Sequence, residues 1–96
     1  MAGFLHIFRI STEKSPDGKD QNQYQVTLSI GGNNYLRVYD EMKLGEFLTT
    51  KAVLDPETFD RAMKELHLAG HTTIGNVGID EYETPALGLE QVPADY

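Results

Sequence analysis

The sequence predicts an α+β domain, in which one main helix at about residues 56–69 packs on one face of a mainly antiparallel sheet of four or more strands. Three observations predict this fold: a helix with start and stop signals, a strand whose side chains alternate between apolar and polar, and turn residues between the strands. A length of 96 residues with 40% hydrophobic residues suits a single domain, 1–96, with one core.

The N-terminal part reads as a strand followed by a loop. Residues 4–10 carry apolar side chains at both even and odd positions. Such a strand is usually interior to its sheet and covered on both sides, and we expect this here. Residues 13–23 hold no apolar side chain and include the turn signal Pro16-Asp17-Gly18, which predicts an exposed loop.

Residues 24–30 and 35–39 form a predicted hairpin. The apolar positions of its first strand are Tyr24, Val26, Leu28 and Ile30. A loop of even length would leave Leu36 and Val38 on the polar face, because a slip of one residue moves every side chain to the other face. A three-residue loop instead pairs Leu28 with Leu36, and a five-residue loop pairs Leu28 with Val38. We therefore predict a loop of odd length.

An odd loop places large polar residues together on the second face of this hairpin. The predicted surface consists of Tyr35, Arg37 and Tyr39 with Gln25 and Thr27. Tyrosine and arginine are enriched at interface hot spots, so this face is a candidate protein-binding or self-association surface. Two alternatives stay open: the tyrosines are ordinary strand residues, or the C-terminal segment covers them.

The helix at 56–69 has agreeing local signals. Asp55 suits the N-cap, Pro56 suits the first helical position and Gly70 suits the left-handed residue that ends a helix. One apolar stripe runs along it: Phe59, Ala62, Met63, Leu66 and Ala69. Residues 41–54 are ambiguous, and a short helical turn or a loop are both compatible with them.

The C-terminal part reads as one more strand and an acidic tail. Residues 71–79 predict a strand in which Gly75 and Gly78 mark a bulge or a close backbone approach. Residues 80–96 lack periodicity but contain apolar side chains, so we expect an irregular tail that docks on the domain.

No motif predicts a cofactor, and no metal site is predicted. The glycine-rich run 70–78 lacks the lysine and the spacing of a phosphate-binding loop. His67 and His71 are four residues apart, which makes them weak zinc candidates, but Gly70 breaks the helix between them. Without a sign of a perturbed carboxyl group, we favour a non-enzymatic protein and keep a small metal- or ligand-dependent enzyme as one alternative.

Charge and composition limit the partners. The net charge is −7, and residues 49–96 carry three Lys/Arg against nine Asp/Glu. This balance disfavours binding to nucleic acid and to anionic membranes. As an alternative to the interaction module, it suits an acidic accessory or inhibitor protein that presents carboxylates to a basic partner. We expect a protein partner or a homo-oligomer. The absence of cysteine and of a long apolar run predicts a soluble, cytoplasmic protein outside the membrane.

Overall fold

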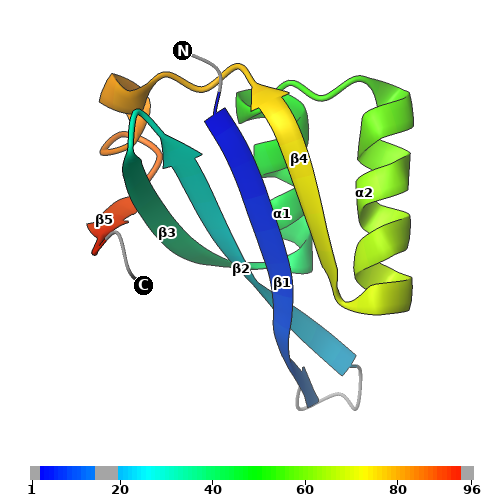
Figure 1. Ribbon diagram of the computed structural model, residues 1–96. Coiled ribbons are helices and arrows are strands. Elements are labelled where there is room, and N and C mark those ends of the chain that lie inside the picture. Colours follow the sequence, from blue (N-terminus) through cyan, green and yellow to red (C-terminus); the bar gives the residue numbers. More distant parts are fainter. Residues whose placement is uncertain (1–2, 15–19, 94–96) are drawn as a thin grey trace.

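The computed structural model describes residues 3–14 and 20–93 of the chain. It contains a five-stranded antiparallel sheet in the order β4-β1-β2-β3-β5, with two helices, which confirms the α+β prediction (Figure 1). In chain order the elements are β1 (Gly3–Lys14), β2 (Asp20–Ile30), β3 (Asn33–Asp40), α1 (Glu41–Glu46), the π-helical turn η1 (Phe47–Lys51), α2 (Pro56–Ala69), β4 (His71–Val77), the 3-10 turn η2 (Glu81–Glu83) and β5 (Glu90–Val92).

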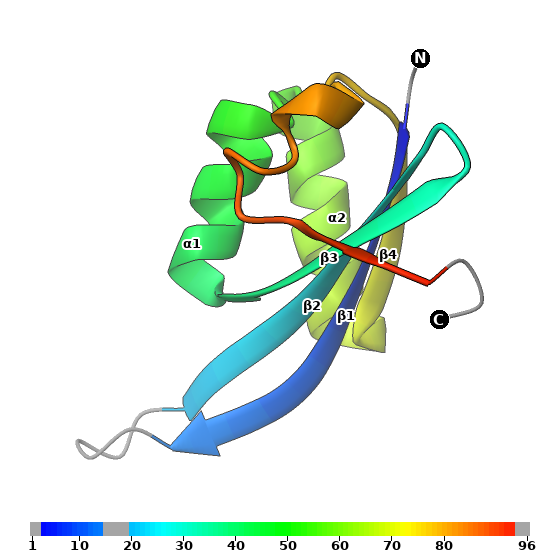
Figure 2. The same ribbon diagram turned by 90° about the vertical axis from the view of Figure 1, so that its left-hand side faces the viewer.

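The fold has two layers, because both helices lie on the same face of the sheet (Figure 2). The core lies between the layers, where Leu44 of α1 and Leu66 of α2 are fully buried against Leu5, Val26 and other strand residues. No described helix covers the opposite face, which is called the open face below.

β1 is interior to the sheet, as its sequence predicts, but the prediction that it is covered on both sides is wrong. Leu5 and Ile7 are fully buried under the helices, whereas Phe4 and Phe8 are 51% and 46% exposed on the open face. The apolar side chains of this strand therefore lie on two different surfaces: one set is in the core, and the other is on the uncovered face of the sheet.

The predicted loop at 13–23 is in large part a hairpin arm. β1 continues to Lys14 and β2 begins at Asp20, with Lys14 opposite Asp20 across the hairpin. Strand pairing needs only backbone groups, so a polar sequence does not exclude it. The Pro16-Asp17-Gly18 signal lies outside the described residues.

The β2–β3 register contradicts the predicted odd loop. The loop is the two residues Gly31 and Gly32, and Leu28 lies opposite Tyr35 rather than Leu36. Both glycines have positive φ, 60° and 81°, as a type I′ turn requires, and this turn matches the twist of the flanking strands. Tyr35 and Tyr39, which an odd loop would place on the surface, are instead buried on the helix side.

The ambiguous segment 41–54 is helical over most of its length. Asp40 caps α1 by accepting a hydrogen bond from the Lys43 backbone N–H at 2.8 Å. The helix then widens into η1, where the Thr50 hydroxyl donates to the Glu46 carbonyl at 2.6 Å. A threonine hydroxyl that bonds to the carbonyl four residues earlier often bends a helix, which fits the change from α1 to the wider turn η1.

α2 confirms the predicted bounds and caps. The Asp55 side chain accepts from the Thr58 N–H, Pro56 opens the helix, and Gly70 ends it with φ 81°. Within the apolar stripe, Ala62 and Leu66 are buried and Phe59 and Met63 are partly buried, but Ala69 is exposed.

The last strands complete the sheet. β4 carries an extra residue relative to β1 between Ile74 and Val77, so a bulge lies beside Gly75 as predicted. Part of the segment expected to be irregular is a strand, β5, which pairs with the β3 edge. Among the described residues, no helix is long and apolar enough to cross a lipid bilayer.

The glycine turn can be tested by a pair of substitutions. Gly32→Ala should lower the free energy of unfolding by about 1 kcal/mol. Alanine at φ 81° is strained, although its Cβ would meet no atom within 4 Å. Gly31→Ala should cost more, since its Cβ would lie 2.9 Å from Glu81 Oε1. Urea unfolding measures both.

Gly45→Ala is the matched control for this pair. It lies in α1 with free space around its Cβ and should be neutral or stabilising by up to about 1 kcal/mol. Turn substitutions that are as harmless as this one would contradict the two-residue turn.

Candidate functional site

The predicted interaction surface does not exist as one face. Tyr35, Arg37 and Tyr39 lie on the helix-facing side of β3, whereas Gln25 and Thr27 of β2 lie on the open face. The even loop causes this separation. Tyr35 and Tyr39 are only 8% and 7% exposed and belong to the core.

Tyr35 is a structural residue that fixes the C-terminal segment. Its hydroxyl donates to Glu81 Oε2 at 2.6 Å, and Asn33 Nδ2 donates to the same oxygen at 2.6 Å. These two donors lower the pKa of Glu81 below its ordinary value, while the bond to Glu81 raises the pKa of Tyr35. The pair joins β3 to η2.

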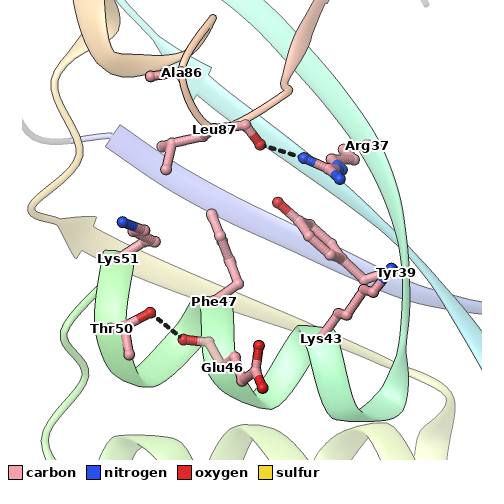
Figure 3. Close-up of a pocket in the computed structure, with 9 residues that line it drawn as sticks. All are labelled: Arg37, Tyr39, Lys43, Glu46, Phe47, Thr50, Lys51, Ala86 and Leu87. Carbon is pink, nitrogen blue, oxygen red and sulfur yellow. Dashed lines mark hydrogen bonds between the residues drawn. The ribbon is translucent and has the colours of Figure 1, made fainter.

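Arg37 and Tyr39 line a surface hollow of about 290 Å³ between β3, η1 and residues 86–87, called the basic hollow below (Figure 3). The Arg37 guanidinium lies over the Tyr39 ring at 5.0 Å and donates to the Leu87 carbonyl at 2.6 Å. Burial raises the pKa of Tyr39, and nearby Arg37 partly opposes that shift. Lys43 and Lys51 also line this hollow.

Gly88 gives the Arg37 side chain its space. Its φ is 74°, and a Cβ at this position would overlap the Arg37 guanidinium. The glycine therefore allows both the left-handed backbone and the close approach of Arg37.

The two histidines proposed as metal candidates lie on opposite sides of the sheet. His67 Nε2 contacts Glu41 Oε1 at 2.8 Å on the helix side, whereas the His71 ring lies beside Phe8 on the open face, with 6.2 Å between ring centroids. Gly70 separates them by ending α2. Among the residues whose side chains are described, no three His, Asp or Glu form a group that could hold a metal ion.

The carboxylates with shifted pKa values have structural roles. Hydrogen bonds from Thr58 lower the pKa of Asp55 at the α2 N-cap. Those from Tyr35 and Asn33 lower the pKa of Glu81. In the acidic segment, the Glu83 side chain accepts from the N–H of Asp80, the residue that caps η2. A general acid would need a raised pKa, and neither of these two groups provides it.

The open face is the surface that the sequence argument missed. Three rows of side chains cross its centre, and a further pair, Gln23 and Asp40, lies at its margin; all are read from the strand registers. The first row is Phe4, Ser29, Asn34 and Val92; the second is Thr73, His6, Thr27, Leu36 and Glu90; the third is His71, Phe8, Gln25 and Val38. The sequence sign of this surface is that residues 4–10 are apolar on both faces of the strand, a pattern that also fits a strand covered on both sides.

The open face has two apolar ridges and a polar furrow. Phe4 and Phe8 form the ridge on β1, and Leu36 and Val38 form the ridge on β3. A hollow of about 330 Å³ lies over β2, where Gln25, Thr27 and Ser29 line it. Its β1 wall is His6 and Phe8, and its β3 wall is Asn34. The Phe4 ring lies against Gly75 of β4, where a Cβ would come within 3.4 Å of it.

Comparison with protein-family models, with curated proteins and with solved structures finds no match to this chain. Its function is therefore inferred from the geometry.

Acid should test the Tyr35–Glu81 bond. Because the folded pKa of Glu81 is lowered, its contribution to stability is present above the unfolded pKa and is lost as pH falls through the folded value. Glu81→Gln should therefore flatten the decline in unfolding free energy as the pH falls below the ordinary pKa of glutamate, measured by urea denaturation. A variant that loses stability in acid as steeply as the parent would contradict this assignment.

Gly88→Ala should lower the free energy of unfolding by about 2 kcal/mol or more, because the alanine would both strain the backbone and clash with Arg37. In an Arg37→Ala background, the same change should cost only the backbone part, about 1 kcal/mol. A double-mutant cycle by urea unfolding measures the difference, and equal costs in both backgrounds would show that Arg37 does not lie over Gly88.

Proposed function

We propose that this chain is a non-enzymatic, self-associating interaction module, and that the open face of its sheet is the contact surface between two copies. The observation that carries the proposal is the half exposure of Phe4, Phe8 and Val38, at 51%, 46% and 45%, on one uncovered sheet. Exposed apolar patches of this kind mark interaction surfaces. The lack of cysteine supports a cytoplasmic setting.

The shape of the open face is compatible with packing against the same face of a second copy. A ridge on β1, a furrow on β2 and a ridge on β3 make a surface whose ridge can enter the furrow of an identical surface turned by a two-fold axis. Two sheets that pack face to face at about −30° interdigitate in this way. Gln25 and Thr27, two of the residues proposed from sequence, would form the floor of this contact.

The charge distribution also favours a second copy. A net charge of −7 makes two copies repel each other over most approaches. Among the described side chains, the registers place two carboxylates on the open face, and both lie at its margins: Glu90 on the edge strand β5, and Asp40 at the end of β3. Two copies that meet face to face therefore bring few charges together, whereas a basic partner would be drawn to the acidic surfaces elsewhere.

The available area fits a modest dimer. Four strands over about six residues each, and the three residues of β5, spaced about 4.8 Å apart, cover roughly 450 Å² in projection, and more with protruding side chains. Two such faces bury about 1,000–1,400 Å² in total, which reaches the lower range of specific interfaces. The dimer is therefore expected to form in a concentration-dependent way.

Sedimentation velocity from low micromolar to near-millimolar protein tests the proposal. The parent chain should shift from monomer to dimer, and Phe8→Glu should weaken dimerisation at least about tenfold by placing a charge in the contact. Phe8 is half exposed, so the variant should keep its fold, which circular dichroism checks.

Leu68→Glu is the matched control, because Leu68 is 78% exposed on α2, on the other side of the molecule. It makes the same kind of change in charge and should leave dimerisation unchanged. A parent chain that stays monomeric throughout, or a Phe8→Glu variant that dimerises like the parent, would overturn the proposal.

A further inference from the structure

The basic hollow is a second site, on the opposite side of the sheet from the open face (Figure 3). We infer that it binds a small organic anion, whose apolar body lies against the parts of Tyr39, Phe47 and Leu87 that line the hollow and whose carboxylate or phosphate faces Arg37 and Lys43, with Lys51 on the far side of the ring pair. This inference goes beyond the proposed self-association and does not depend on it.

The charge at the hollow has the sign opposite to that of the whole chain. Three of the eight Lys/Arg residues line it, and Glu46 is the one carboxylate among the lining residues. Among the described residues, the ion pairs are Arg61–Glu65 and His67–Glu41, so none of these three cations is in an ion pair. Arg37 bonds to a neutral carbonyl, which leaves its charge uncompensated. Cations that line one hollow without an ion-pair partner attract an anion.

The apolar part of the hollow is aromatic. The Tyr39 and Phe47 rings are stacked, with centroids 5.2 Å apart and planes at 28°. Lys51 lies on one side of this ring pair, and Arg37 and Lys43 lie on the other (Figure 3). Leu87 closes the hollow from the C-terminal segment. Aromatic walls with a few charged groups are typical of small-molecule sites.

The backbone beside the hollow is unusual at two points. One wall is η1, and π-helical turns are rare and frequent at functional sites. Val53, two residues after η1, is exposed and has φ 50°, a conformation that a β-branched residue seldom adopts. A neighbouring hollow of about 470 Å³ is lined by Val53 and shares Lys51 and Leu87 with the first. Strained residues of this kind cluster at ligand-binding segments.

The size of the hollow limits the ligand. A volume of about 290 Å³ is at the lower end for small-molecule sites, so the ligand is a compact anion with one or two rings.

A titration followed by nuclear magnetic resonance tests the inference. The ¹⁵N-labelled chain is titrated with 2-naphthoate and, separately, with 2-naphthyl phosphate, and with neutral 2-naphthalenemethanol as the uncharged probe. At least one anion should give saturable shifts at the amides of Tyr39, Phe47 and Lys51, and the tighter one identifies the preferred head group. The neutral probe should bind at least about fivefold more weakly.

Substitutions separate this site from general charge effects. Lys43→Gln with Lys51→Gln should weaken binding of the anion about fivefold or more. Lys64→Gln is the matched control, because Lys64 is exposed on α2 and does not line the hollow. It should leave affinity unchanged.

Three results would overturn the inference: no saturable shifts with either anion, shifts confined to Phe8 and its neighbours on the open face, or equal loss of affinity in the Lys64→Gln control. Each is independent of the oligomeric state. The Phe8→Glu variant should bind the anion like the parent chain, so failure of the dimer leaves this test unaffected.

Discussion

The Gly31–Gly32 turn is the constraint on which the arrangement of this molecule depends. Two consecutive residues with positive φ give a two-residue connection that only glycine makes without strain. That connection sets the β2–β3 register, and the register assigns every side chain of β3 to a face. With one residue more in the loop, Tyr35 and Tyr39 would be outside and Leu36 and Val38 inside.

The inward tyrosines connect the sheet to the C-terminal segment. Tyr35 brings a hydroxyl into the core, and that hydroxyl requires a partner because an unpaired buried polar group is costly. Glu81 is that partner, and Arg37 makes a second link through the Leu87 carbonyl. β5 then pairs with the β3 edge. The basic hollow lies between these links and α1, so it follows from the same register.

The outward residues of β3 determine the character of the other side. Leu36 and Val38 join Phe4 and Phe8 on the open face, whose two carboxylates, Asp40 and Glu90, lie at its margins. The two candidate sites thus lie on opposite sides of one sheet. A contact between copies on the open face leaves the basic hollow accessible, so the two sites can act independently.

The sequence by itself determined the elements whose signals are local. α2 has a cap and a proline at its start and a glycine at its end, and residues 24–30 of β2 alternate without interruption, so short-range sterics and periodicity define both. Only the tertiary structure decided that the second apolar side of β1 is uncovered, because both helices pack on the other face of the sheet. It also decided the side on which Tyr35 and Tyr39 lie. Tyrosine is stable both in a core with a hydroxyl partner and on a surface, and its partner Glu81 is 46 residues away in the chain.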